Sequence, residues 1–345
     1  MITTTLTLIA FLGVIAFVTA AALSPIESLS WWAGWNEVET SEAGDDPIEP
    51  LVLERMAPPV AAEGDAPLLD ASAPPLLDAD AAVEKRKVIY LSGISVMAGR
   101  HLAPQESWFI DALRKRHPNT DIITDVFPYS PTGKTLLHTP RLLGRFWRRA
   151  MRLRLKGRGA IAALANWRNF FQVLVSADHR YGPIFNLGAS RVLLEALERH
   201  DYAFGSGAPV TIIGFSGGAQ IGLGAATFLK PRINAPIDII SIGGVMASDH
   251  GLNTVRSVYR FYGSRDRMRL MGPLFFAERW AIMRYSDWNQ AVRKGVIVSR
   301  KIGAMAHAGP RGYFGVQKKS SGNGRYVDDT LDAVSDALKA LASKR

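Results

Sequence analysis

The residues of this 345-residue chain that are best suited to chemistry lie in one short stretch, residues 210–220. A β-branched apolar run ends in Gly-Phe-Ser-Gly-Gly, so Gly214, Ser216 and Gly218 form a G-x-S-x-G pattern between an expected strand and an expected helix. Because glycine has no Cβ, Gly214 and Gly218 allow the strand and the helix to pass closely at a sharp turn. The pattern predicts that Ser216 is a nucleophile and that the Gly217 N–H donates to an oxyanion.

A serine nucleophile needs a base, and the base needs an acid that orients it. Asp266 comes just after an expected strand at 257–262, and His307 comes just after the next expected strand, at 295–299. The chain order is therefore Ser, acid, His. This order predicts that Asp266 orients His307 and that His307 takes the serine proton.

With these residues in this order, the chain resembles the α/β-hydrolase superfamily, whose three catalytic residues lie on loops at the carboxyl ends of a parallel sheet. The resemblance covers about residues 86–343. It implies cleavage of a carboxylic ester, a lipid or other acyl ester, through an acyl-enzyme on Ser216. The alternative is a catalytically inactive membrane scaffold or binding protein with the same fold.

The resemblance also places a second oxyanion donor in the loop after an earlier strand. Residues 88–92 are that expected strand, and Gly93, Ile94 and Ser95 follow it. The N–H of Ile94, or that of Ser95, is the predicted donor. The chain lacks the His-Gly or triple-glycine motif that many members carry at this loop.

Other acids and histidines remain as alternatives for the same roles. Asp249 is the second candidate for the acid, whereas Asp238 lies inside an expected strand. His250 follows a strand but precedes the acid, which reverses the order of the family. His117 and His200 are expected at helix ends, where a histidine is favourable to the helix dipole.

Several other chemistries are excluded or disfavoured by the residues. The chain has no cysteine, which excludes disulfides and thiol catalysis. Residues 130–135 end like a phosphate-binding loop, but Pro128 stands where the first glycine is required. No His cluster has metal-ligand spacing. We therefore expect no cofactor and no metal.

The order of apolar runs predicts an α/β fold, a mostly parallel sheet flanked by helices, over residues 85–345. Expected strands lie at 88–92, 121–127, 210–215, 237–242, 257–262 and 295–299. About 80 residues separate the second strand from the third, so a helical lid or insertion is expected at about 130–182. A crossover helix is expected at 186–200.

The N-terminal part has a different composition. Residues 6–23 form an uncharged apolar run, which within residues 1–35 predicts a transmembrane anchor, with a cleaved signal peptide as the alternative. Residues 36–84 are rich in Ala, Pro, Glu and Asp and are expected to be a disordered linker. Residues 1–84 carry a net charge of −13 and residues 85–345 one of +23.

A basic segment lies within the expected insertion. Residues 141–158 contain eight Arg or Lys residues and no acid, with apolar residues interleaved at helical spacing. Such a helix suits an anionic membrane surface, and a solvated lid helix is the alternative. No nucleic-acid-binding module accompanies the charge, so a nucleic-acid partner is not expected. The predicted partners are an acyl-ester substrate and a membrane lipid surface.

Overall fold

The computed structural model describes residues 86–95, 102–131, 160–319 and 324–343, together with a few positions between 25 and 33. The predicted apolar anchor at 6–23, the linker at 36–84 and the basic segment at 141–158 lie outside the described residues. Within the described part, no helix is both long enough and apolar enough to cross a bilayer.

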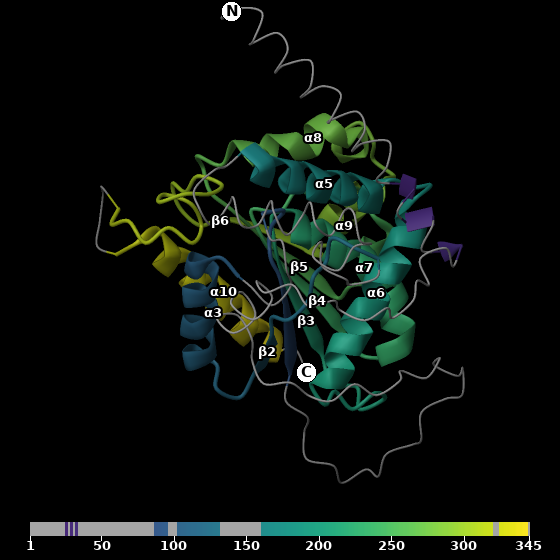
Figure 1. The fold of residues 1–345 in the computed structure, drawn as a ribbon, viewed down its shortest axis with the longest axis horizontal. Helices are drawn as coiled ribbons and strands as arrows, with labels where there is room; N and C mark the ends of the chain where they lie inside the picture. Colours follow the sequence, from purple (N-terminus) through teal and green to yellow (C-terminus); the bar gives the residue numbers. More distant parts are fainter. Residues whose placement is uncertain are drawn as a thin grey trace, which may run out of the picture.

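The described chain folds around a six-stranded sheet in which every neighbouring pair of strands is parallel (Figure 1). The strand order is β2-β1-β3-β4-β5-β6. The bounds are β1 Lys87–Leu91, β2 Asp121–Ile123, β3 Val210–Phe215, β4 Ile237–Ile242, β5 Ser257–Tyr262 and β6 Ile297–Lys301. All residues of β1, β3 and β4 are buried, as expected for parallel strands covered on both faces.

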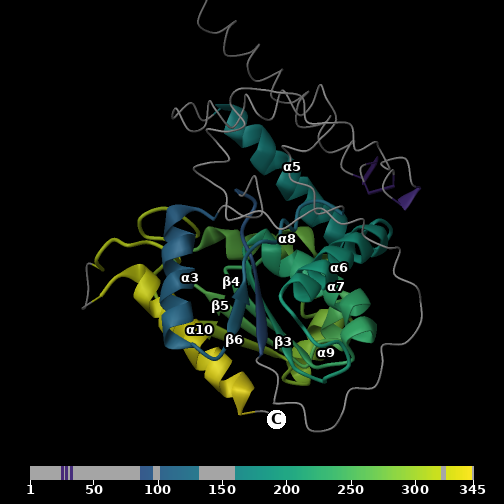
Figure 2. The same ribbon diagram turned by 60° about the horizontal axis from the view of Figure 1, so that its bottom comes forward.

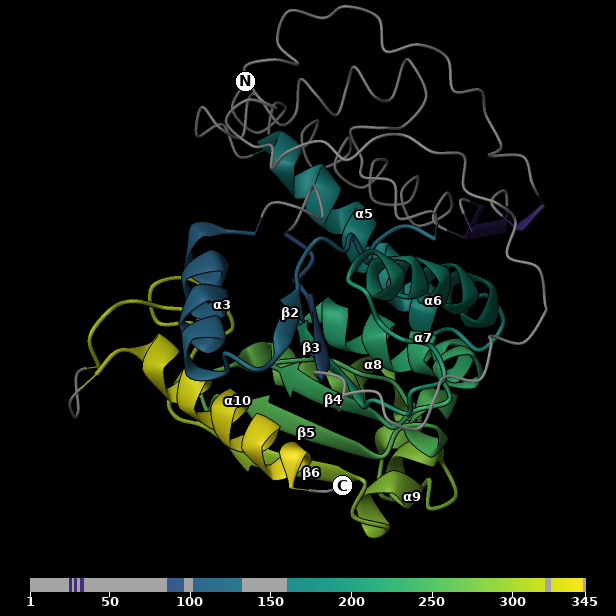
Figure 3. The same ribbon diagram turned by 90° about the horizontal axis from the view of Figure 1, so that it is seen from below.

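Helices cover both faces of the sheet (Figure 3). Helices α3 (Pro104–Arg116) and α10 (Tyr326–Ala342) pack on one face. Helices α6 (Gly182–Arg199), α7 (Gly217–Ile233) and α9 (Asp287–Arg293) contribute to the core on the other face. Figure 2 shows α5 (Ala160–Ala177) running across one end of the sheet.

The packing follows from the helix sequences. Helix α10 buries residues at helical spacing, Val327, Leu331, Val334, Leu338 and Leu341, and so forms one apolar stripe. Helix α7 instead approaches the sheet through small residues. A Cβ at Gly222 would lie 2.8 Å from a methyl group of Ile212 on β3, so the glycine sets how closely this helix packs.

The observed elements confirm the predicted α/β fold with a parallel sheet flanked by helices. Three elements differ from the expectation by two or more residues, and one of them is β6, which spans Ile297–Lys301 where a strand at 295–299 was expected. The strand expected at 121–127 ends at Ile123, because β2 is an edge strand whose ladder with β1 ends there. The crossover helix begins at Gly182, with Pro183 in its first turn, where a missing N–H costs nothing.

Between β5 and β6 the chain adds short helices that the sequence pattern does not predict. They are η3 (Arg267–Leu270), α8 (Met271–Phe275) and η4 (Ala277–Arg279), and they precede α9. A further short helix, η2 (His250–Asn253), follows β4. Two of these helices begin at an aspartate cap: Asp249 accepts from Gly251 N–H at the start of η2, and Asp266 accepts from Met268 N–H at the start of η3.

Candidate active site

Ser216 lies at the sharp turn that joins β3 to α7. Its φ of 52° and ψ of −121° are in a region that residues with a side chain rarely adopt. The adjacent glycines make the turn possible: a Cβ at Gly218 would lie 2.5 Å from the Leu91 carbonyl oxygen, and one at Gly214 would collide with the backbone of Ala219. The sequence at this turn thus places Ser216 at the carboxyl end of β3 and directly before the N-terminus of α7.

Three residues that are far apart in the sequence form a continuous hydrogen-bonded chain. The Ser216 Oγ lies 2.9 Å from the Nε2 atom of His307, and the Nδ1 atom of His307 lies 3.0 Å from Oδ2 of Asp266. When Nδ1 carries the ring proton, Nε2 is free to accept the serine proton. The structure therefore brings together the three residues named from the sequence; their catalytic role stays a prediction.

Asp266 is buried, and its carboxylate is well supplied with donors. Met268 N–H donates to Oδ1 at 2.8 Å, and the Tyr313 hydroxyl donates to Oδ2 at 2.7 Å, beside His307. Burial by itself would raise the pKa of Asp266. The bonds from His307, Tyr313 and Met268 outweigh burial and lower that pKa below its usual value. The carboxylate is thereby kept charged next to the imidazole.

Tyr313 is a site residue that the sequence reasoning missed. Its hydroxyl accepts a hydrogen bond from Gly263 N–H at 2.8 Å while donating to Asp266. Burial, and then the bond to Asp266, raises the pKa of Tyr313, so the phenol stays protonated. The residue joins the loop after β6 to the end of β5. In the sequence, the one signal that could have pointed to Tyr313 is its position six residues after His307.

The ring of His307 is fixed by aromatic packing as well as by hydrogen bonds. Phe215, directly before the serine, stacks on it with ring centroids 5.4 Å apart and an interplanar angle of 22°. Tyr313 meets the ring edge-on at 6.2 Å. Stacking on one face and an edge contact restrict the tilt of the imidazole, so Nε2 stays directed at Ser216.

The loop after β1 lies beside the serine. A Cβ at Gly93 would be 3.4 Å from the Cβ of Ser216, and one at Gly217 would be 3.1 Å from the Cγ2 of Ile94. Asn169 of α5 donates to the Ile94 carbonyl at 2.9 Å, and Tyr129 donates to the Ser92 carbonyl at 2.7 Å. Ile94 and Gly217 are thus neighbours, as two oxyanion donors must be; donation by them stays a prediction.

The alternative candidates for the acid and the base lie away from Ser216. Asp249 caps η2 and accepts from Gly251 N–H and from Gln220. Asp238 binds Arg256 and Ser257 inside the sheet. His250 is exposed and pairs with Asp287, and His117 and His200 are the C-caps of α3 and α6, as expected. In the structure none of these residues is hydrogen-bonded to Ser216 or His307.

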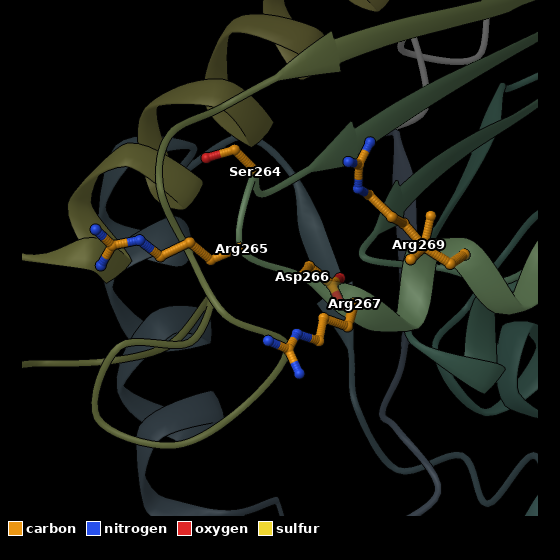
Figure 4. Close-up of a pocket in the computed structure, with 6 residues that line it drawn as sticks. Ser264, Arg265, Asp266, Arg267 and Arg269 are labelled. Carbon is orange, nitrogen blue, oxygen red and sulfur yellow. The ribbon is translucent and has the colours of Figure 1, made fainter.

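Arginines border the acid on its loop. A cavity of about 390 Å³ is lined by Ser264, Arg265, Asp266, Arg267, Arg269 and Leu270. Figure 4 shows these side chains around the loop that carries Asp266. Among the residues that the structure describes, no group of three or more His, Asp or Glu side chains is placed to hold a metal ion.

Comparison of the sequence with protein-family models finds no match, and comparison with curated proteins finds no relative.

Proposed function

We propose that this protein is a serine hydrolase of the α/β-hydrolase type that cleaves a carboxylic ester through an acyl-enzyme. The observation that carries the proposal is the unbroken hydrogen-bonded chain from Ser216 through His307 to Asp266. The α/β fold with a parallel sheet supports it, since the three residues follow β3, β5 and β6.

The first half of the proposed reaction forms the acyl-enzyme. Ser216 Oγ attacks the ester carbonyl carbon while its proton passes to Nε2 of His307. The N–H groups of Gly217 and Ile94 hold the oxyanion; one such donor is worth about 10²–10³ in kcat. His307 then protonates the departing alkoxide oxygen, and the alcohol leaves. Throughout, Asp266 holds the imidazole in its tautomer and stabilises the imidazolium.

The second half reverses these roles. Water attacks the acyl carbonyl and gives its proton to His307, which returns it to Ser216 Oγ as the acid departs. One ester and one water are consumed, an alcohol and an acid are released, and the protein is regenerated.

We further propose that the substrate carries an apolar acyl chain and that a membrane surface is a partner. Large apolar side chains are exposed in the segment before α9; Ile282 is 80% exposed and Leu274 is 67% exposed. Most of them lie within residues 270–285, and Trp167 of α5 is exposed as well. The exposed side chains in this segment are Leu270, Leu274, Phe275, Trp280, Ile282, Met283 and Tyr285. Phe275 meets Phe170 of α5 at 6.2 Å between ring centroids, and Phe170 meets Trp167 at 5.8 Å. Exposed apolar side chains concentrated in this way support contact with lipid. Changing Leu274 and Ile282 to Asp should slow cleavage of an ester held in vesicles more than that of a monomeric ester; equal slowing contradicts the surface role.

The alternative is a catalytically inactive scaffold or binding protein with the same fold. The donors around Asp266 and the stacked His307 favour the enzyme, because a scaffold does not require an oriented imidazole 2.9 Å from a strained serine. The strained backbone at Ser216 costs about 1–3 kcal/mol of stability, and a catalytic role of the serine would explain why the strain is kept.

Labelling with a fluorophosphonate probe tests the proposal. We expect the purified full chain to be labelled at Ser216, and Ser216→Ala to abolish labelling without unfolding the protein. Ser264→Ala is the matched control, because Ser264 is exposed on the loop that carries Asp266. Labelling that persists in Ser216→Ala would show that Ser216 is not the nucleophile, and a wild-type chain that never reacts would favour the scaffold.

A further inference from the structure

Three arginines from different elements gather around two aromatic rings on the side of β5 that faces α9. The guanidinium carbon of Arg260 lies 5.4 Å from the ring centroid of Tyr262 and 6.0 Å from that of Trp288. Arg279 lies over the same Trp288 ring at 3.7 Å, and Arg269 over Tyr262 at 5.9 Å. Arg260, Arg269 and Arg279 are called the arginine cluster below.

The arginine cluster has no anionic partner within the described residues. None of the ion pairs found there includes Arg260, Arg269 or Arg279. Arg279 donates through Nη1 to the Met246 carbonyl at 2.9 Å, yet its Nε is buried without an acceptor, as is the Nε of Arg260. Uncompensated positive charge away from water is costly.

Burial disfavours the charged form of the two buried guanidinium groups. It lowers the pKa of Arg279 to about 9, and the neighbouring charge of Arg260 adds to the effect. Burial also lowers the pKa of Arg260. Arg256, directly before β5, shows the usual solution, since it pairs with the buried Asp238. The arginine cluster lacks such a counter-ion.

The nearby acids are already engaged. Asp266 attracts Arg260 electrostatically, but its two oxygens accept from Met268, His307 and Tyr313. Glu278, next to Arg279 in the sequence, pairs with His179. Within the described residues, no acid therefore balances the charge of the arginine cluster, and Arg269 presents its guanidinium group to solvent, where an anion from outside the chain can reach it.

The arginine cluster lies at the same end of the sheet as Ser216. Arg260 is in register with Ser241 on β4, and the turn after β4 brings Gly244 against both Ser241 Oγ and the Ser216 carbonyl. Asp266 lies four residues beyond the end of β5. Figure 4 shows Arg269 and Arg265 directed to opposite sides of the loop that carries Asp266.

From this geometry we propose that the arginine cluster binds an oxyanion, a carboxylate or a phosphate, carried by the substrate, so that Ser216 acts on anionic esters. This inference rests on the proposed hydrolase function. Guanidinium groups bind both oxyanions through paired N–H donors, and stacking on Trp288 and Tyr262 holds Arg260 and Arg279 in place before the ligand arrives. The anion would supply the counter-charge that the chain does not.

Two measurements test the proposal with the full chain. The first is calorimetric titration of Ser216→Ala, which cannot turn over an ester, with inorganic phosphate and with acetate. We expect binding that Arg260→Gln and Arg269→Gln weaken and that Arg265→Gln does not. Arg269 is exposed, so its variant should fold even where a change at Arg260 is damaging; Arg260→Lys should restore binding in part.

The second measurement is the specificity ratio, kcat/KM for an anionic ester divided by kcat/KM for its neutral counterpart. Suitable pairs are mono-4-nitrophenyl glutarate with 4-nitrophenyl pentanoate, and 4-acetoxybenzoate with its methyl ester. 4-Acetoxyphenyl phosphate tests the phosphate arm. Loss of one charged hydrogen-bonding group should lower the ratio roughly 10- to 100-fold in Arg260→Gln, mainly through KM. Arg265→Gln should leave it unchanged.

The outcomes separate the two proposals. If esters are cleaved but neither the ratio nor anion binding depends on Arg260 or Arg269, the anion site is wrong and the hydrolase stands. If anions bind through the arginine cluster but no ester is cleaved and no probe labels Ser216, the anion site stands and the hydrolase is wrong. If phosphate and acetate fail to bind and no ester is cleaved, both are wrong.

Discussion

Asp266 and Glu106 are buried carboxyl groups that each accept a hydrogen bond from a tyrosine, yet their pKa values shift in opposite directions. Asp266 accepts from Tyr313 at 2.7 Å, and its pKa is lowered. Glu106, in α3, accepts from Tyr90 of β1 at 2.8 Å, but burial raises its pKa to about 7. One tyrosine donor does not offset burial for Glu106.

The difference lies in the additional donors. Asp266 has the His307 ring and the Met268 N–H as well as Tyr313. A buried carboxyl group stays ionised only when several donors or a nearby positive charge replace its lost hydration. The comparison teaches that the His307 contact and the loop N–H, more than burial or the tyrosine, distinguish the proposed catalytic acid from a structural one.

Removal of the histidine should have the largest effect. His307→Ala takes away the base and one of the donors to Asp266, so kcat should fall by about 10⁴–10⁶, because the proposed triad acts as a unit. His250→Ala is the matched control, since it removes an exposed histidine that pairs with Asp287. Steady-state kinetics measure both. A larger loss for His250→Ala would show that the acid–base assignment is wrong.

Neutralising the acid should have the next largest effect. Asp266→Asn keeps the shape of the side chain but favours the wrong imidazole tautomer, so kcat should fall by about 10³–10⁴. Glu106→Gln is the control for loss of a buried carboxyl group and should leave kcat within about threefold. Similar losses in both variants would remove the distinction between the two carboxyl groups.

The raised pKa of Glu106 predicts a pH dependence of stability. The folded protein favours the protonated acid, so this contribution is fully present below about pH 4.5 and is lost as the pH rises to about 7. Between pH 5 and pH 8 the wild type should lose about 2–3 kcal/mol of unfolding free energy relative to Glu106→Gln. Urea unfolding at both pH values measures this; parallel curves would contradict the shift.

The smallest effect is expected for the tyrosine hydroxyl at the site. Tyr313→Phe leaves Asp266 with its other donors, so stability at pH 7 should fall by about 1 kcal/mol and kcat by about tenfold. Because the folded pKa of Asp266 is lowered, its stabilising contribution holds above the ordinary aspartate pKa near 3.9 and is lost as the pH falls further. The stability difference between variant and wild type should therefore shrink on acidification, which urea unfolding from pH 7 to pH 3 will show.

Much of the fold could be predicted because buried parallel strands are recognisable in the sequence as short apolar runs. Ser216, Asp266 and His307 each come after such a run, so their place at the carboxyl end of the sheet could be predicted as well. Tyr313 could not, since it lies in a loop without a period and meets Asp266 only through folding. The arginine cluster is spread over β5, η3 and η4, so no local pattern unites it. Glu106 resembles an ordinary first-turn acid of a helix until Tyr90 is placed beside it.

The all-parallel sheet also governs how the protein reaches its active form. Lys87 of β1 pairs with Val210 of β3, so the central ladder joins segments separated by more than a third of the chain. Such distant pairings close slowly, because the entropy of a long loop is lost before contacts compensate it. The loops after β1, β3, β5 and β6 meet only when the sheet is complete. On dilution from urea, the helical circular dichroism signal should therefore return well before esterase turnover, and a chain cleaved in the β1–β3 connection before folding should regain neither the sheet nor the activity.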